Sequence, residues 1–383
     1  MKSVVVDVVE AFDDIRPYRD DEVGPAIARL CNDRAFIAFA GRFAAPRLPR
    51  RIRALTYPAL RVLVRRTAAR LRSVDDLQRL MSGYLKTLLQ HTSDGMTVSG
   101  LDDLDSTSPY LFISNHRDIA LDPTLLNYAL WLEGHATTQV AIGDNLLGTG
   151  FLSQLMRVNK AFLVARDVSG AKAQLKAMRQ TSTYMRKTLE AGESVWIAQR
   201  EGRSKDGMDR TEPALLKMLQ LAYRNDARAV TDWLRHVRLV PVSITYEIDP
   251  CAPSKARELY FTAKDGGYRK QPGDDIESIE TGVRGFKGRI HLHFSAPIDG
   301  DFGNADELAR HLDGEIVSNL VAYPTHSYAR ARLNGSEADL TDTSLRGRQA
   351  FFDDLNTCPP EHAPYFLRQY ANLVENQLAI RPA

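Results

Sequence analysis

The sequence predicts an α/β protein in which a mixed, mostly parallel sheet is flanked by helices, with an N-terminal helical domain and a C-terminal helical extension. Three observations support this fold class. Short apolar runs alternate with helical patterns within residues 93–300, residues 1–92 show no strand pattern, and helical periodicity returns after Gly300. Strands separated by helices need crossover connections, which are typical of parallel or mixed sheets.

The first predicted domain, residues 1–92, consists of helices interrupted at prolines. It contains the segment Arg42–Arg72, in which ten arginines occur without a single acid. Within it, the apolar residues of 58–71 recur at helical spacing on one face, and arginines occupy the rest. Two interpretations are open: a helix packed on the main domain with a solvated basic face, or an interfacial helix that lies on anionic lipid.

The second predicted domain, residues 93–300, supplies the sheet. Strands are expected at 97–99, 110–114, 140–142, 161–164, 194–198, 238–245 and 289–294. Helices are expected at 123–132, 146–157, 170–190 and 213–223. Residues 263–288 are rich in glycine and charge, which favours a loop or insertion. The third predicted domain, residues 301–383, is the helical extension, with an amphipathic helix at 306–320 and a helical cover from Gln349 onward.

The stretch after the buried strand 110–114 carries the clearest chemistry. His116, Asp118 and Asp122 lie on a strand-to-helix turn, and Asp122-Pro123 is typical of a helix start with Asp122 as the N-cap. Such turns in open α/β sheets converge on a crevice. A neutral imidazole beside a carboxylate can remove the proton of an alcohol. Because Gly-x-Ser-x-Gly is absent, we expect direct attack by an acceptor hydroxyl on a thioester rather than an acyl-enzyme.

Residues suited to a phosphate group follow the strand 194–198. They are Arg200, Glu201, Gly202, Arg203, Ser204 and Lys205. Guanidinium, ammonium, hydroxyl and backbone N–H groups form charge-assisted hydrogen bonds with phosphate oxygens. Arg166 joins them if its strand is a neighbour. Glu201 is expected to orient the cations or to receive a second hydroxyl of the acceptor, rather than to act as a base.

Four blocks occur in a fixed order: Asn115-His116 with Asp122-Pro123, then Phe162–Arg166, then Glu201–Gly207, then Val240–Ser243. Over about residues 95–300, this order resembles the glycerophospholipid acyltransferases, which make phosphatidic acid from lysophosphatidic acid, and their relatives that acylate glycerol-3-phosphate. The resemblance implies their fold, His116 as general base with Asp122 as its partner, and an acceptor-phosphate site that includes Glu201, Gly202 and Arg203. It also implies an acyl-CoA or acyl-carrier-protein donor and a membrane-resident acceptor.

The sequence departs from the family pattern in two places. Five residues separate His116 from Asp122 where the family has four, so the motif is only HX4D-like. Either Asp122 keeps the orienting role or Asp118 takes it, and we expect Asp122 because an N-cap directs its carboxylate back to the turn. In the third block no spacer separates Gly202 from Arg203, and Gln199-Arg200 replace Phe-Pro.

Composition excludes several classes of function. The 50 basic and 48 acidic residues nearly balance, so no nucleic-acid partner is expected. Three scattered cysteines lack metal-ligand spacing, which indicates a reducing compartment and no metal site. No uncharged apolar run is long enough to span a bilayer. We therefore expect a cytoplasmic protein, peripheral to the inner face of the membrane, that docks on an anionic surface through Arg42–Arg72.

Together these features predict an O-acyltransferase of phospholipid biosynthesis. It would move a fatty acyl group from acyl-CoA or an acyl-carrier protein to a hydroxyl of a lysophosphatidic-acid-like acceptor, with no cofactor beyond this co-substrate. Two alternatives remain open. One is a non-catalytic lipid-binding protein on a degenerate acyltransferase fold, and the other is an acyltransferase for a non-phosphate acceptor.

Overall fold

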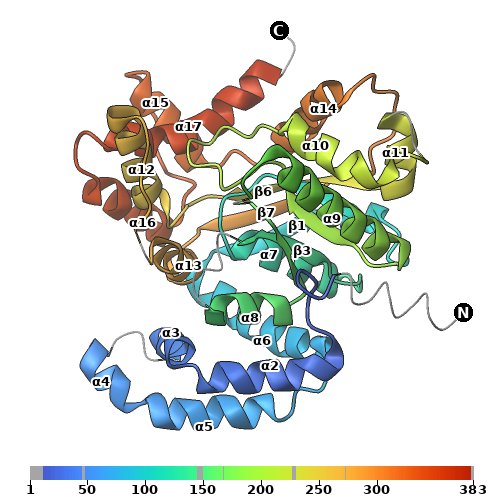
Figure 1. Ribbon diagram of the computed structural model, residues 1–383. Coiled ribbons are helices and arrows are strands. Elements are labelled where there is room, and N and C mark those ends of the chain that lie inside the picture. Colours follow the sequence, from blue (N-terminus) through green and yellow to red (C-terminus); the bar gives the residue numbers. More distant parts are fainter. Residues whose placement is uncertain are drawn as a thin grey trace, which may run out of the picture. The chain divides into compact units, whose positions relative to one another are not determined.

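The computed structural model describes residues 12–44, 48–144, 150–166, 168–226, 230–271 and 273–380 (Figure 1). The chain divides into two compact units, each described by itself below. Unit 1 comprises Met1–Tyr84 and Gln139–Tyr184, and unit 2 comprises Leu85–Thr138 and Met185–Ala383. The predicted domain boundaries at residues 92 and 300 stay a prediction.

Unit 1 is mainly helical. Its helices are α2 (Asp20–Asn32), α3 (Arg34–Ala44), α4 (Arg50–Leu55), α5 (Tyr57–Ala68) and α8 (Gly150–Val158), with parts of α6 (Val74–Thr92) and α9 (Ala171–Glu190). The strands β3 (Gln139–Gly143) and β4 (Ala161–Val164) pair in parallel. A buried cluster joins α2 to α6 and α8 and is formed by Val23, Ala26, Ile27, Cys31, Leu77 and Val158.

The helix predicted at 58–71 forms as α5, but it ends at Ala68 and its predicted apolar face is divided. Val64 and Ala68, with Leu71 beyond the helix end, pack on the buried cluster. Leu63 instead is 62% exposed. The predicted segment Arg42–Arg72 also includes Arg47, which lies outside the described residues.

Unit 2 contains five strands of the sheet. Its strands are β1 (Gly95–Ser99), β2 (Leu111–Ser114), β5 (Val195–Ala198), β6 (Leu239–Tyr246) and β7 (Arg289–Phe294), in the order β1-β7-β6-β2-β5. All neighbours are parallel except β6 and β7. Every residue of β2 is buried, as a continuous apolar run between two parallel partners requires. The predicted fold class, a mixed and mostly parallel sheet with helices, is confirmed.

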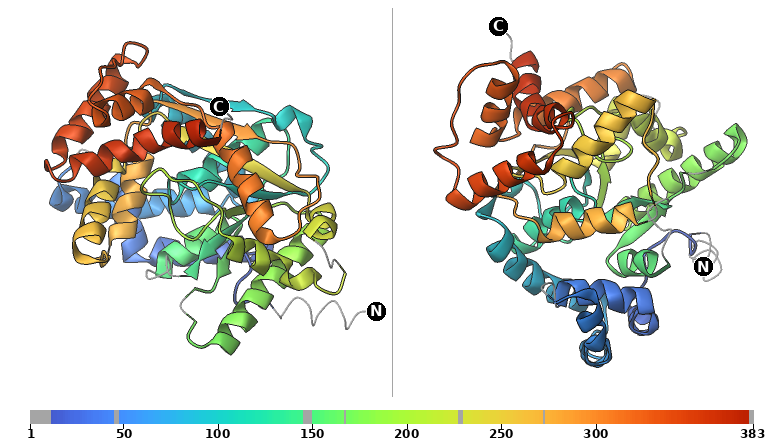
Figure 2. Two further views of the ribbon diagram at one scale, coloured as in Figure 1. Left: turned by 90° about the horizontal axis from the view of Figure 1, so that it is seen from above. Right: turned by 90° about the vertical axis from the view of Figure 1, so that its left-hand side faces the viewer.

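The helices of unit 2 are α7 (Leu121–Leu132), α10 (Pro213–Leu219), α11 (Val230–Val237), α12 (Ala252–Asp265), α13 (Asp274–Arg284), α14 (Ala305–Ser318), α15 (Pro324–Leu333), α16 (Leu345–Thr357) and α17 (Ala363–Ile380). Two short 3-10 helices cover Leu101–Asp103 and Gln220–Tyr223. The C-terminal helices α15, α16 and α17 gather with α12 (Figure 2). No helix among the described residues combines the length and the apolar character that a membrane crossing needs.

One predicted loop is wrong. Residues 263–288 hold the end of α12 and the whole of α13, because the glycines lie mostly at helix ends rather than in a flexible stretch. Gly266 takes φ +75° as the C-cap of α12, and Gly273 takes φ +102° as the N-cap of α13. The acids of the first turn of α13 favour its N-terminus through the helix dipole, and Ile279 is buried.

Candidate active site

His116 lies in the turn between β2 and α7. Its ring Nδ1 is 2.8 Å from Oδ2 of Asp122, a fully buried carboxylate. The same oxygen accepts the backbone N–H groups of Arg117 at 2.5 Å and Asp118 at 2.9 Å. The other oxygen of Asp122 accepts the hydroxyl of Tyr246 at 2.7 Å. Asp122, and not Asp118, is therefore the carboxylate that contacts the imidazole.

Asp118 holds the start of α7. Its Oδ1 accepts the backbone N–H groups of Ala120 at 2.9 Å and Leu121 at 2.8 Å. Because α7 begins at Leu121, the predicted N-cap at Asp122 is wrong, and the side chain of Asp118 satisfies the N–H groups that a helix start leaves open. Oδ2 of Asp118 faces α13 so closely that a Cβ on Gly282 would lie 1.9 Å from it.

Electrostatics distinguishes the two carboxyl groups. Burial by itself would raise the pKa of Asp122, but the hydrogen bond and charge of His116, with the Asp118 N–H and the Tyr246 hydroxyl, hold that pKa below its usual value. Burial, and then the negative charge of Asp122, raise the pKa of Asp118. Burial and Asp122 also raise the pKa of Tyr246 well above its usual value, so its hydroxyl stays a donor. Asp122 thus keeps its charge beside the imidazole.

Two contacts fix the turn against the sheet. The Asn115 amide donates to the carbonyl of Ile244 at 2.9 Å and accepts the Ile244 N–H at 2.8 Å, so a side chain continues the pairing of β2 with β6. The Trp196 ring lies edge-on to the His116 ring, with 5.7 Å between the centroids. Trp196 is held in turn because its Nε1 donates to Oγ of Ser114 at 3.0 Å. The imidazole is therefore positioned from the strands on both sides of β2.

The loop that follows β5 is bonded directly to the His116 turn. The Ser204 N–H donates to the carbonyl of His116 at 2.7 Å. The guanidinium of Arg117 donates to Oγ of Ser204 at 3.0 Å and to Oδ2 of the buried Asp209 at 2.5 Å. The structure therefore places Ser204, and with it the predicted phosphate-binding loop, beside His116.

Two arginines of this loop have buried nitrogen atoms that make no hydrogen bond to a described residue. Nε of Arg200 and Nη1 of Arg203 are buried without a hydrogen-bond partner in the described part of the chain, and so are both amide atoms of Gln199. Buried polar groups are normally paired, so this deficit indicates that a polar ligand group or water completes the set.

The other predicted loop residues differ in their contacts and in their exposure to solvent. The Lys205 ammonium pairs with Glu258 of α12, and the Ser204 hydroxyl donates to the carbonyl of Met208 at 3.1 Å. Glu201 and Gly202 are exposed, and Gly202 takes φ +72° with open space around it. Of the cations in the loop, Arg200 and Arg203 are therefore the better candidates for an anionic ligand.

Arg166 belongs to unit 1, where its backbone N–H donates to Oδ1 of Asp144 at 3.0 Å. Its predicted place beside the loop stays a prediction. The catalytic and phosphate-binding roles assigned above from the sequence also stay predictions, since contacts alone do not test them.

Three residues of the site were not predicted from the sequence: Tyr246, Arg117 and Asp209. Tyr246 is the last residue of β6, one residue beyond the predicted strand end, and β6 is a parallel neighbour of β2. The carboxyl ends of adjacent parallel strands meet at one edge, so this position could have been found by extending the strand by one residue. Arg117 and Asp209 lie far apart in sequence and carried no comparable signal.

Comparison with known proteins extends this picture. Residues 95–245 match the family model described as Acyltransferase. The chain is 27% identical over 206 residues to a glycerol-3-phosphate acyltransferase of Pseudoalteromonas atlantica, and 27% identical over 190 residues to one of Alteromonas mediterranea. These alignments cover 54% and 49% of this chain but 23% and 21% of the relatives, so the chain spans less than a quarter of their length.

Among solved structures, the 1-acyl-sn-glycerophosphate acyltransferase PlsC of Thermotoga maritima aligns with a TM-score of 0.40 and 15% identity. The alignment covers 63% of this chain and 78% of that one. The family match spans all four sequence blocks, and it includes His116 and the loop after β5. Residues 95–245 are therefore similar to the Acyltransferase family, and about half of the chain is similar to part of the glycerol-3-phosphate acyltransferases.

Proposed function

We propose that this protein transfers an acyl group from a thioester to a hydroxyl of a glycerol-phosphate-type acceptor, with His116 as the general base. Nε2 of His116 takes the proton of the acceptor hydroxyl while its oxygen attacks the thioester carbonyl. The tetrahedral intermediate then expels the thiolate, which receives the proton from the imidazolium. Asp122 holds Nδ1–H and stabilises the positive charge that forms on the ring.

The observation that carries this proposal is the 2.8 Å contact between His116 Nδ1 and Asp122. It leaves Nε2 as the basic nitrogen, on a turn that is bonded to an arginine-containing loop. The unpartnered N–H groups of Arg200 and Arg203 favour an anionic acceptor such as a phosphate ester. The match of residues 95–245 to the Acyltransferase family model supports acyl transfer. The lysophosphatidic-acid-like acceptor and the acyl-CoA or acyl-carrier-protein donor are parts of the proposal.

The first test is a thiol-release assay with acyl-CoA and acyl-carrier-protein donors. Lysophosphatidic acid, glycerol-3-phosphate and a neutral long-chain alcohol are compared as acceptors. The proposal expects release that depends on a phosphate acceptor, with lysophosphatidic acid preferred. Release with the neutral alcohol alone supports the non-phosphate alternative, and binding of lipid without release in any arm supports the non-catalytic one.

Replacing the proposed base gives the second test. His116→Ala is expected to lower kcat by about 10²- to 10⁴-fold, because general base catalysis contributes a factor of this size. His236→Ala serves as the control, since Nδ1 of that ring contacts the carbonyl of Asp232 on its own helix and the ring packs against Tyr223. Full thioester-dependent acylation by His116→Ala would exclude the role given to this histidine.

We also propose that unit 1 docks reversibly on anionic membrane. Four large apolar side chains of α4 and α5 are exposed: Ile52, Leu55, Val62 and Leu63, with Leu55 at 80%. Exposed arginines in the same segment are Arg51, Arg65, Arg66, Arg70 and Arg72. Apolar side chains with interspersed arginines suit the interface of an anionic bilayer, where each cation contributes about 1 kcal/mol. Such a surface would bring a cytoplasmic enzyme to an acceptor in the inner leaflet.

Liposome co-sedimentation tests the docking proposal. Binding is expected to require anionic lipid and to weaken as salt rises, because salt screens exposed charges. Equal binding to neutral vesicles at high salt would contradict the electrostatic part of the proposal.

A further inference from the structure

The loop after β5 is held on its other side by the C-terminal helix α17. Nδ2 of Asn372 donates to the carbonyl of Asp206 at 2.6 Å, and Nδ2 of Asn376 donates to the carbonyl of Gly207 at 3.2 Å. The two amides are one helical turn apart, so they lie on the same face of α17 and reach successive carbonyls of the loop. Backbone contacts of this kind set where the loop lies.

Gly207 allows the helix to approach this closely. Its φ is +79°, and a Cβ placed on it would lie 2.3 Å from the carbonyl oxygen of Gln369. Any other residue here would be strained in its backbone and would also push the loop away from α17. The two asparagine contacts therefore depend on a glycine at this position.

Beside the contact at Gly207, the loop and the helix are not packed tightly along their whole length. A cavity of about 30 Å³ lies between them, lined by Arg117, Ser204, Lys205, Tyr246, Gln369 and Tyr370 among others. It has room for about two water molecules. Because side chains do not fill this space, the hydrogen bonds of Asn372 and Asn376 add to the close approach at Gly207 in holding the α17 side of the loop.

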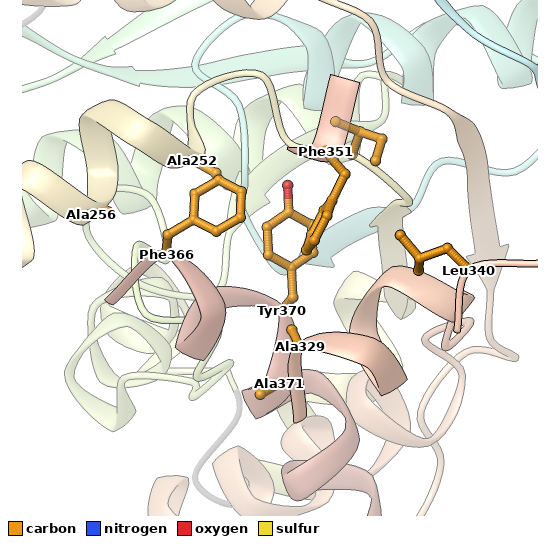
Figure 3. Packing of buried hydrophobic residues seen from close by; sticks show 9 residues of the cluster. Ala252, Ala256, Ala329, Leu340, Phe351, Phe366, Tyr370 and Ala371 are labelled. Carbon is orange, nitrogen blue, oxygen red and sulfur yellow. The ribbon is translucent and has the colours of Figure 1, made fainter. Parts of the chain in front are cut away.

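Helix α17 is itself anchored independently of the loop. Nε2 of Gln377 donates to the carbonyls of Val317 at 3.1 Å and Leu320 at 2.6 Å. Phe366 and Tyr370 of α17 pack with Phe351 of α16 in a buried aromatic cluster (Figure 3). The helix is thus a fixed support, and the loop lies between it and the His116 turn.

We propose that α17 positions the acceptor-binding loop, with Asn372 and Asn376 as positioning residues that set the distance from Arg200 and Arg203 to His116. This inference rests on the proposed function for the identity of the bound group. It assigns the C-terminal extension a task in acceptor recognition. A shift of the loop changes how the phosphate is held. The position of the thioester carbonyl relative to the imidazole stays the same.

The test compares amides of one helix that differ in what they contact. Asn372→Ala, Asn372→Asp and the double variant Asn372→Ala with Asn376→Ala are measured against Gln377→Ala. The aspartate keeps the shape of the side chain but cannot donate. With lysophosphatidic acid and an acyl-CoA, the double variant is expected to raise the acceptor KM about tenfold or more, with the donor KM unchanged. Asn372→Asp should behave like Asn372→Ala.

Gln377→Ala removes a comparable helix contact without touching the loop, so its acceptor KM should stay at the wild-type value even if the melting temperature falls. An equal rise in acceptor KM for Gln377→Ala, or a parallel rise of both KM values in the double variant, would overturn the inference. Amide hydrogen exchange at 203–209 provides a readout that is independent of activity and should be faster only in the loop variants. If the wild type turns over no acceptor, the proposed function fails, and unchanged exchange at 203–209 would still refute the positioning role.

Discussion

At the scale of single residues, the environment of Asp122 is the most demanding in the proposed site. Its two oxygens receive one imidazole, two backbone N–H groups and one phenol, and no water-exposed surface remains. A carboxylate with this many donors cannot be replaced by an amide without turning at least one contact into a clash of two donors. Asp118 has no comparable surroundings, since its bonds go to the backbone of α7.

The different contacts of Asp122 and Asp118 therefore predict different effects when each is replaced by asparagine. Asp122→Asn is expected to lower kcat by roughly 10³- to 10⁴-fold, because an amide no longer fixes the tautomer that leaves Nε2 basic. Asp118→Asn is expected to keep kcat within a few-fold and to leave the helix start intact, because asparagine caps as well as aspartate. Steady-state kinetics and thermal melting of both variants measure this, and a larger loss of kcat in Asp118→Asn would contradict the assignment.

The sequence predicted correctly that Asp122, rather than Asp118, contacts His116. The reason given, that Asp122 is the N-cap of α7, was wrong. An Asp-Pro pair is a common helix start, yet here the N–H groups are satisfied by a residue three positions before the first helical one. N-capping depends on which of several nearby polar side chains reaches the backbone, and sequence alone does not decide between candidates. Tyr246 shows the same limit, since its bond to Asp122 depends on strand order.

At the scale of elements, the buried ring of His326 makes α15 sensitive to pH. Burial, and then the charge of Arg117, lower the pKa of His326 to about 3. Its Nδ1 accepts the Tyr323 N–H at 2.9 Å in the first turn of α15. The folded state thus holds this histidine neutral, whereas the unfolded chain takes up a proton near pH 6.5. The stabilisation is complete above that pH and is lost as pH falls toward 3.

His326→Gln tests this dependence, because a glutamine at the third helical position can also accept from the N-cap N–H. Between pH 7.5 and 5, the free energy of unfolding of the wild type is expected to fall by roughly 2 kcal/mol more than that of the variant. Urea unfolding at both pH values measures the difference. Equal losses in the two proteins would mean that His326 does not titrate in this way.

The elements that the sequence predicted well are those with continuous apolar runs. β2, β5 and β6 lie within one residue of their expected limits, since a run that is buried on both faces has few other solutions. α11, α12 and α13 were not predicted, and for α13 the reason is that the acids and glycines of residues 263–288 suggested a loop. Their helical form depends on burial of residues such as Trp233 and Ile279, which only the tertiary structure provides.

At the scale of the whole molecule, the balanced charge conceals a local excess. The formal net charge is only +2, although Arg42–Arg72 contains ten arginines and no acid. Acidic residues elsewhere cancel this excess in the sum, but they do not cancel it at a surface within a Debye length. The balanced composition therefore argues against a protein that binds polyanions over its whole surface. It does not argue against a local segment that docks on a membrane.

Three arginines of this segment provide the quantitative test. Arg66, Arg70 and Arg72, changed together to Gln, are expected to weaken binding to anionic vesicles by about 3 kcal/mol, or roughly 150-fold, because each contributes about 1 kcal/mol. The control changes Arg224, Arg310 and Arg332, three exposed arginines of unit 2, to Gln. Both triple variants then carry the same net charge. Equal weakening by both triple variants would indicate a general charge effect and not a docking surface.

The contact between Gly282 and Asp118 has a consequence for protein engineering. Replacing a helical glycine by alanine ordinarily stabilises a helix by about 1 kcal/mol, so propensity-based redesign would select Gly282 in α13 early. Here the added methyl carbon would meet a carboxylate oxygen at 1.9 Å, on Asp118, whose side chain accepts the N–H groups at the start of α7 and whose backbone N–H donates to Asp122. A change made more than 150 residues away in sequence would thereby disturb the geometry of His116, and thermostability screens of this protein should leave that glycine unchanged.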